Sequence, residues 1–122
     1  MALSAAQRFL KEYERQTNTH DFKRVAPLIH KKASYWFTDG SFFGRTKIKQ
    51  AFERTWDHIK EEKYRIRDVK QIASSRTLIA LCYRFEWRGL INGKMRKGVG
   101  RGTTVLIWEG KRWKVLHEHL SR

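Results

Sequence analysis

The sequence predicts one α+β domain, with helices in its first half and mostly strands in its second half. Apolar residues recur at helical spacing before Lys63, and beyond Lys63 the period changes to two. The dipeptide Asn92-Gly93 is a strong signal for a hairpin turn between two long strands. With 1 Pro and 8 Gly the chain lacks the composition of a linker, so residues 1–122 are expected to form a single domain.

Three segments have the pattern of amphipathic helices. The first begins at Ser4, which forms a capping-box pattern with Gln7, and is expected to run to about residue 18. The second begins at Asp21 and should be brief, because Pro27 cannot donate a backbone hydrogen bond. The third has the clearest periodicity, with one face formed by Ile48, Ala51, Phe52, Thr55, Trp56 and Ile59.

Five segments are expected to be strands. An early strand at 33–37 ends in a turn at Asp39-Gly40. The other four follow the third helix, at 64–71, 77–90, 95–108 and 112–120, and short turns join them. Such a meander needs its faces covered, and the amphipathic helices can cover only one of them.

The composition excludes several classes of protein. No apolar run approaches the roughly 20 residues that a membrane span requires. Residues 1–13 carry polar side chains in every turn, which is not the pattern of a secretory signal. The only cysteine, Cys82, cannot form an intramolecular disulfide or an all-cysteine metal site, and it is expected to be an inert buried thiol. A cytoplasmic location is therefore expected.

The chain is strongly basic: 27 Lys and Arg against 12 Asp and Glu give a net charge of +15. Such a charge attracts polyanions at low salt. The basic residues are spread over both halves, with local concentrations at 65–70 and 94–97. No helix-turn-helix, zinc-finger or base-stacking motif accompanies them. A basic solvated surface is the preferred interpretation, and nucleic-acid binding is the less favoured alternative.

Several stretches of the sequence resemble the nuclear transport factor 2-like superfamily, and within it the SnoaL-like group of small bacterial proteins. They are His20-Asp21, Phe37-Thr-Asp-Gly40, Gly44-Arg45, Gly100-Arg101-Gly102-Thr103 and Trp113-Lys-Val-Leu-His117-Glu-His119-Leu-Ser121. The resemblance implies a cone, in which a curved antiparallel sheet wraps over helices and leaves a cavity at its wide end. Members commonly form dimers through the outer face of the sheet. Because their functions diverge widely, the resemblance does not name a reaction.

The resemblance to ketosteroid isomerase, a relative within the superfamily, covers only part of its catalytic apparatus. Tyr13 falls at the position of its helical Tyr, whereas Phe37 and Thr104 fall at the positions of its two Asp residues. The isomerase chemistry is therefore not expected here. The remaining candidates are Glu118 or Asp39 as a general base, with Tyr13 polarising a carbonyl.

Each catalytic candidate has an alternative interpretation. Glu118 is either a carboxyl that faces the cavity, with a pKa raised by desolvation, or the partner of a basic side chain in a structural salt bridge. The salt bridge is the preferred interpretation. Tyr13 either donates to a ligand oxygen or is simply part of the core.

Strand parity, anchored on the resemblance, assigns side chains to the two faces of the sheet. The expected cavity wall consists of Tyr35, Phe37, Trp56, Tyr83, Phe85, Trp87, Thr104, Leu116 and Leu120. The expected outer face, suited to a dimer, carries Arg84, Glu86, Arg101, Trp113, His117 and His119, together with Val115. A β-bulge would exchange these faces locally.

The outer face also carries residues that could bind a metal. His117 and His119 share one side of a strand, and a third zinc ligand could come from Glu86 or His30. A hydrogen-bonded structural pair is preferred, so neither a metal nor a cofactor is expected. Arg101 is likewise expected to pair with Glu86 rather than to bind a ligand carboxylate.

The combined interpretation is a homodimeric domain that binds a small, largely apolar organic molecule in its cavity. If the protein turns this molecule over, the resemblance implies acid–base chemistry of the lyase, isomerase or cyclase type. Two alternatives belong to other classes. One is a non-catalytic module for dimerisation or protein interaction, and the other is a sequence-independent nucleic-acid binder.

Overall fold

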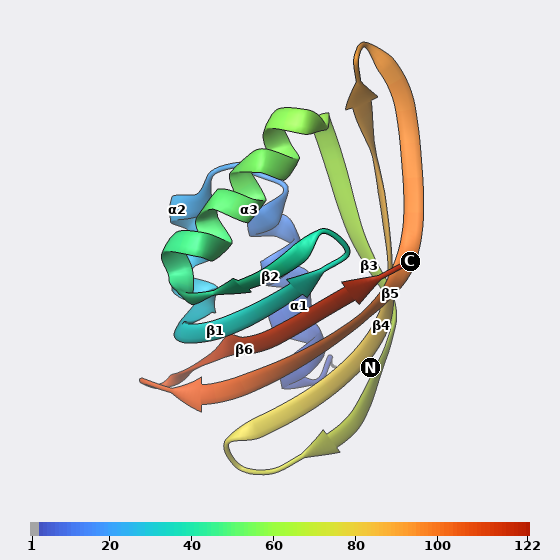
Figure 1. Ribbon diagram of the computed structural model, residues 1–122. Helices are drawn as coiled ribbons and strands as arrows, with labels where there is room; N and C mark the ends of the chain where they lie inside the picture. The colour runs from blue at the N-terminus through green and yellow to red at the C-terminus, as the bar shows by residue number, and fades with distance from the viewer. Residues whose placement is uncertain (1–2) are drawn as a thin grey trace.

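A computed structural model describes residues 3–122. Residues 1–2, which belong to the expected domain 1–122 and to the segment 1–13, lie outside the described part. The helical elements are α1 (Ala5–Thr17), α2 (Phe22–Val25), the 3-10 turn η1 (Ala26–Leu28) and α3 (Gly44–His58). They lie on the concave side of a curved sheet, whose other side carries no helix among the described residues (Figure 1).

The helix boundaries follow from local capping. The Ser4 hydroxyl accepts a hydrogen bond from the Gln7 backbone N–H at 3.1 Å, and the Gln7 side chain accepts from the Ser4 N–H at 3.0 Å. This is the predicted capping box. The Asp21 side chain caps α2, and the next turn is a 3-10 helix that has Pro27 near its start. The predicted brevity of the second helix is confirmed.

The sheet contains six strands in the order β2-β1-β6-β5-β4-β3. The strands are β1 (Ile29–Phe37), β2 (Gly40–Phe43), β3 (Lys60–Ser74), β4 (Leu78–Ile91), β5 (Lys94–Glu109) and β6 (Arg112–Ser121). The meander of the last four strands is confirmed, and β1 joins it parallel to β6. The edge strand β2 was not predicted, because its four residues are too few to show a clear period.

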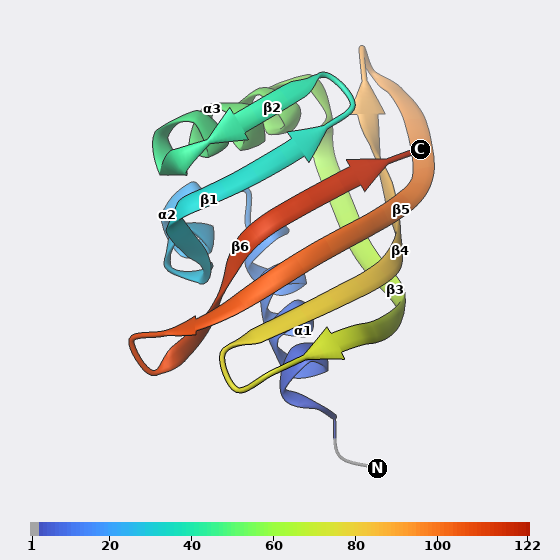
Figure 2. The same cartoon turned by 60° about the horizontal axis from the view of Figure 1, so that its bottom comes forward.

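Figure 2 shows how strongly the long strands curl around the helices. Register shifts occur within β3 and between β5 and β6, and such bulges increase the local bend and twist. In β6, His117 pairs with Val105 while Val115 pairs with Leu106, so Leu116 is the extra residue of a bulge.

This bulge corrects two expectations about the faces. Val115 was expected outside, but it is fully buried in the core. Trp113, expected on the dimer face, packs against the same core and lies edge-on to Trp108. Because the extra residue reverses the alternation, every side chain before the bulge takes the opposite face from the one that simple parity gives.

Glycines on β5 make room for aromatic rings on β4. In the register, Gly98, Gly100 and Gly102 lie opposite Trp87, Phe85 and Tyr83. A Cβ atom built on Gly102 would lie 2.3 Å from the Tyr83 ring, closer than any real contact. The rings therefore lie flat across the β5 backbone, where larger residues would force them into the interior.

We expect Gly102→Ala to destabilise the fold by about 1–3 kcal/mol, because the added methyl group would displace the buried Tyr83 ring, whose hydroxyl is bonded to Thr104. This corresponds to a fall in Tm of roughly 3–12 °C for a chain of this size. Thermal unfolding followed by circular dichroism measures the effect. Val99→Ala is the matched control, since Val99 lies on the same strand and is 72% exposed. Equal melting temperatures for the two variants would contradict this account of the glycines.

Candidate functional site

The concave side of the sheet, α1 and α3 enclose a cavity of about 420 Å³. Of the residues predicted for the site, the wall contains Tyr13, Phe37, Asp39, Trp56, Phe85, Trp87, Glu118 and Leu120. The wall also contains Thr17, Thr38, Phe52, Thr55, Glu62, Tyr64 and Arg122, which sequence reasoning did not place there. The cavity is thus largely aromatic, with a few polar groups.

Four residues expected in the wall lie elsewhere. Tyr35, Tyr83 and Thr104 are buried in a layer behind it, where their side chains pack in the core or bond to one another. Leu116 does not line the cavity, because it is the bulged residue of β6. The assignment by strand parity therefore holds for Glu118 and Leu120, which follow the bulge.

Paired hydroxyl groups form the layer behind the cavity wall. The hydroxyls of Tyr13 and Tyr35 are 2.7 Å apart, and the Tyr83 hydroxyl is 2.8 Å from Thr104 Oγ1. Burial raises the pKa of Tyr13, Tyr35 and Tyr83 well above the usual value, and the nearby Glu118 charge acts in the same direction. These phenols stay protonated, so each keeps an O–H that can donate.

Glu118 is the most deeply buried carboxyl of the site, at 3% exposure. The preferred salt bridge is not formed by the described residues, and its Oε1 has no hydrogen-bond partner among them. Burial raises the pKa of Glu118 to about 8, although the Tyr13 hydroxyl lowers it in part. The carboxyl is therefore mostly protonated at neutral pH, and it can both donate and accept a proton near pH 8.

A second carboxyl, Glu62, lies in the same wall at 8% exposure. Burial raises its pKa to about 7. Its backbone is fixed, because the His20 ring nitrogen lies 2.9 Å from the Glu62 carbonyl oxygen and the His20 ring stacks on Trp56. Glu62 follows Glu61, which has a positive φ of 53° inside a register shift of β3. The regular alternation of β3 begins only after this irregularity, so the sequence pattern did not predict that Glu62 faces the cavity.

Several residues of the cavity wall carry a buried polar atom without a hydrogen-bond partner. Among the described residues, the buried side-chain oxygens without a partner are Gln16 Oε1, Thr17 Oγ1, Tyr64 Oη and Glu118 Oε1. The last three belong to residues of the cavity wall. A buried polar group without a partner is costly, so these three oxygens are unfavourable for the stability of the fold.

Two predicted residues of the outer face, His117 and His119, contact side chains of the neighbouring strand β1. The Ser34 hydroxyl and His117 Nδ1 are 2.7 Å apart, and Trp36 packs edge-on against His117 and His119. Burial lowers the pKa of His117. The histidines thus form structural contacts, and the residues from 3 onward hold no group of three or more potential metal ligands.

The expected pair of Arg101 and Glu86 is wrong. Glu86 contacts Arg65 at 3.7 Å and Arg67 at 3.5 Å, both from β3. Arg101 lies opposite Arg84 in the register between β4 and β5. The reason is that Glu86 is paired with Val99 on β5 but with Arg65 on β3, so the basic side chains of β3 reach it first.

The curved sheet, the helices on its concave side and the cavity between them define a cone-shaped α+β domain. The chain belongs to the SnoaL-like domain family, whose model matches residues 7–122. No curated protein is similar enough to match it. In the part of the chain that the structure describes, no helix is long and apolar enough to cross a membrane.

Solved structures share this fold at low sequence identity. A nuclear transport factor 2-like superfamily protein from Salmonella enterica has a TM-score of 0.86 at 14% identity, over 93% of this chain and 85% of that one. A protein of Novosphingobium aromaticivorans, provisionally assigned as scytalone dehydratase, has a TM-score of 0.83 at 13% identity, over 95% and 80%. The association domain of Caenorhabditis elegans CaMKII has 0.78 at 13%, over 96% and 92%. At these identities the likeness establishes the fold alone.

The buried Glu118 predicts a specific pH dependence of stability. Its pKa is about 8 in the folded protein and near 4.5 in the unfolded chain, so between these values the folded state holds a proton that the unfolded state releases. Stability should therefore fall as pH rises through this window, by up to about 1.4 kcal/mol per pH unit from this group. Glu118→Gln removes this contribution, so its stability relative to wild type should improve steadily from pH 5 to pH 9.

Urea unfolding of wild type and Glu118→Gln at pH 5, 7 and 9 measures this difference. Glu53→Gln is the matched control, because Glu53 is exposed on α3. A constant offset between wild type and Glu118→Gln at all three pH values would show that Glu118 ionises normally in the fold.

Proposed function

We propose that this protein binds a small cyclic organic molecule carrying a carbonyl or hydroxyl group, and that Glu118 transfers a proton on it. The position of two buried carboxyl residues, Glu62 and Glu118, in the wall of an aromatic cavity supports this proposal. A volume of about 420 Å³ suits a molecule of one to three fused rings. The aromatic walls supply apolar contact, and the polar atoms fix its orientation.

The geometry supports acid–base catalysis without a covalent intermediate. The Glu118 carboxylate accepts a proton from a carbon next to the ligand carbonyl, and a Tyr13 or Tyr64 hydroxyl donates a hydrogen bond to the carbonyl oxygen. Return of the proton to a different atom completes an isomerisation. Burial makes the carboxylate a stronger base than an exposed glutamate, while a pKa of about 8 leaves enough of it ionised at neutral pH.

Glu62 extends this chemistry to elimination. A protonated Glu62 can give its proton to a leaving hydroxyl as Glu118 takes one from the neighbouring carbon, so that water leaves and a double bond forms. The dehydratase assigned to one structural neighbour is consistent with such a reaction. Asp39 is exposed at the edge of the cavity, so it is a poorer candidate than the buried Glu118.

Hydrogen–deuterium exchange tests the proton transfer without knowledge of the natural substrate. The protein should accelerate exchange of the protons next to the carbonyl of 2-tetralone in D₂O, as followed by NMR, and the rate should rise with pH up to about 8. Glu118→Gln should lower the acceleration by roughly 10²–10⁴-fold. Glu53→Gln, on the outside of α3, should leave it unchanged.

Binding is measured separately by quenching of the Trp56 and Trp87 fluorescence with 1-naphthol. If the probe binds and exchange is not accelerated, the acid–base role is wrong and the cavity is a binding site only. If neither probe enters, the proposal as a whole is overturned.

A second candidate function, self-association, is favoured by apolar residues on several strands of the convex face, Trp36, Leu78, Val105 and Ile107, which we call the apolar strip. Leu78 pairs with Ile107, and Trp36 and Leu78 are 46% and 42% exposed. Large exposed apolar side chains in one patch are typical of interfaces between subunits. We propose that two copies associate through this apolar strip. An association domain among the structural neighbours is consistent with it.

Trp36→Glu should weaken this self-association by about 30-fold or more, because a Trp at the centre of an interface contributes much of its binding energy. Sedimentation velocity over a range of concentrations measures the dissociation constant. Val99→Glu is the control, since it introduces the same charge at an exposed position of β5 outside the apolar strip. A wild-type protein that stays monomeric at 100 µM would exclude the dimer.

A further inference from the structure

The convex face of the sheet carries two rows of like charge, which we call the basic rows. In the register of β3, β4 and β5, Lys63 lies opposite Arg88 and Arg88 opposite Lys97. Four residues further along the strands, Arg67 lies opposite Arg84 and Arg84 opposite Arg101. Each row thus places three cations on adjacent strands, roughly 5 Å apart, and the rows are separated by roughly 13 Å.

Such rows are unfavourable for the protein on its own. Like charges directly opposite each other on neighbouring strands destabilise a sheet, whereas opposite charges stabilise it. The row between them contains Arg65, Glu86 and Val99, so it adds one acid and one more base. Glu86 is already engaged by Arg65 and Arg67, and Asp68 reaches Arg84 only at 4.0 Å. Within residues 3–122, Lys63, Arg88, Lys97 and Arg101 form no ion pair.

A groove lies next to the basic rows. It has a volume of about 620 Å³, and Lys63, Arg88 and Lys97 are among its lining residues. Its acidic lining residues are both occupied: Glu86 by the arginines of β3, and Glu14 by the Ile66 backbone N–H, which donates to it at 2.6 Å. Trp87 and the 72%-exposed Val99 give it some apolar surface.

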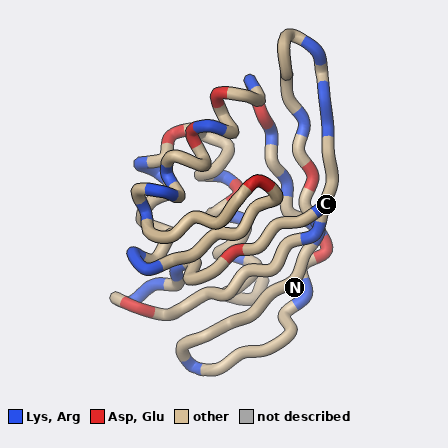
Figure 3. Tube along the Cα trace, viewed as in Figure 1, with Lys and Arg blue, Asp and Glu red and all other residues tan. Residues whose placement is uncertain are grey.

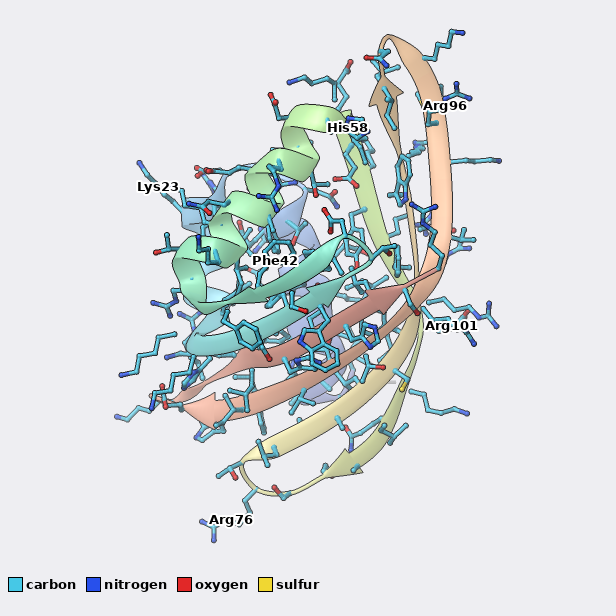
Figure 4. The ribbon with its side chains drawn as sticks, in the orientation of Figure 1. Lys23, Phe42, His58, Arg76, Arg96 and Arg101 are labelled. Atoms are coloured by element: carbon cyan, nitrogen blue, oxygen red, sulfur yellow. The ribbon has the colours of Figure 1, made fainter. Side chains whose placement is uncertain are left out.

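The figures agree with this arrangement. Figure 3 shows Lys and Arg recurring along β3, β4 and β5 with few Asp or Glu between them. In Figure 4, Arg101 points away from the sheet on the side opposite the helices, and Lys23 lies on the far side of the molecule. The basic rows also lie apart from the apolar strip, which involves other residues of the convex face.

We propose that the basic rows bind the phosphate backbone of a nucleic acid, without reading its sequence. A single small anion needs only one or two of these cations, whereas a regular two-row array matches a polymer with charges at fixed intervals. Arginine, the majority type in the rows, donates a fork of N–H groups that fits phosphate oxygens. The exposed Val99 between the rows can contact a sugar or a base. This site is separate from the cavity and does not depend on the function proposed for it.

The test compares two triple variants with the same net charge. One is Lys63→Gln, Arg88→Gln and Lys97→Gln, which removes one basic row. The other is Lys23→Gln, Lys47→Gln and Lys49→Gln, which removes three exposed lysines from the helical side. Fluorescence anisotropy with a labelled 20-nucleotide dT strand and a 20-base-pair duplex gives the affinity between 50 and 300 mM NaCl.

The wild type should bind both probes with an affinity that falls steeply with salt. The basic-row variant should lose about 10-fold or more at 150 mM NaCl and show a salt slope shallower by about 2–3, whereas the helical-side variant should stay within about threefold of wild type. The basic-row variant should also have a raised Tm, because the mutual repulsion is relieved. Circular dichroism shows whether the basic-row variant is folded. If the cavity proposal holds, unchanged quenching by 1-naphthol shows the same.

Three results would overturn the proposal. Equal losses in both triple variants would show that only the net charge matters. Absence of binding at 150 mM NaCl would show that the rows have no affinity for nucleic acid. Equally tight, row-dependent binding of polyglutamate would show that an acidic protein, and not a phosphate polymer, is the partner.

Discussion

The architecture depends on the contact between the glycines of β5 and the aromatic rings of β4. Because Gly98, Gly100 and Gly102 have no side chains, Trp87, Phe85 and Tyr83 lie across the neighbouring backbone and stay out of the centre of the cone. The strands can then curl around the helices while the interior keeps an open volume. A sheet with ordinary side chains at these positions would fill the same space with its own core. The cavity therefore depends on the absence of side chains at these three positions of β5.

The same packing explains why two carboxyls of the cavity wall have raised pKa values. Its walls exclude water from two carboxyls, Glu62 and Glu118, and burial alone brings their pKa values to about 7 and about 8. In a chain with 27 basic residues, the easy way to stabilise these carboxyls would be a salt bridge. Neither has one among the described residues, although it would have lowered their pKa values and made them weaker bases. The fold thus keeps two unpaired buried carboxyls at the cost of some stability.

The sequence was sufficient where its periodicity is unbroken. The face of α3, the meander and the inward position of Glu118 all follow from regular spacing of apolar residues and from the resemblance to the family. It was insufficient where one residue interrupts the alternation. The extra residue Leu116 reversed the faces of Val115 and Trp113, and the irregular Glu61 concealed the inward position of Glu62. Bulges depend on how two strands fit together in space, and a single strand read alone contains little sign of them.

Charge is divided between the two sides of the sheet in a way that keeps the two sites separate. The cavity wall contains Asp39, Glu62 and Glu118 against Arg122 alone, whereas the basic rows lie on the convex side. At physiological ionic strength the Debye length is about 8 Å, so exposed cations across a layer of side chains and backbone have little effect on a buried carboxyl. In accordance with this, burial, and not the surrounding positive charge, dominates the pKa of Glu118. The buried carboxyls of the cavity wall and the basic rows can therefore coexist on one sheet, and each can be changed by substitution without altering the electrostatics of the other.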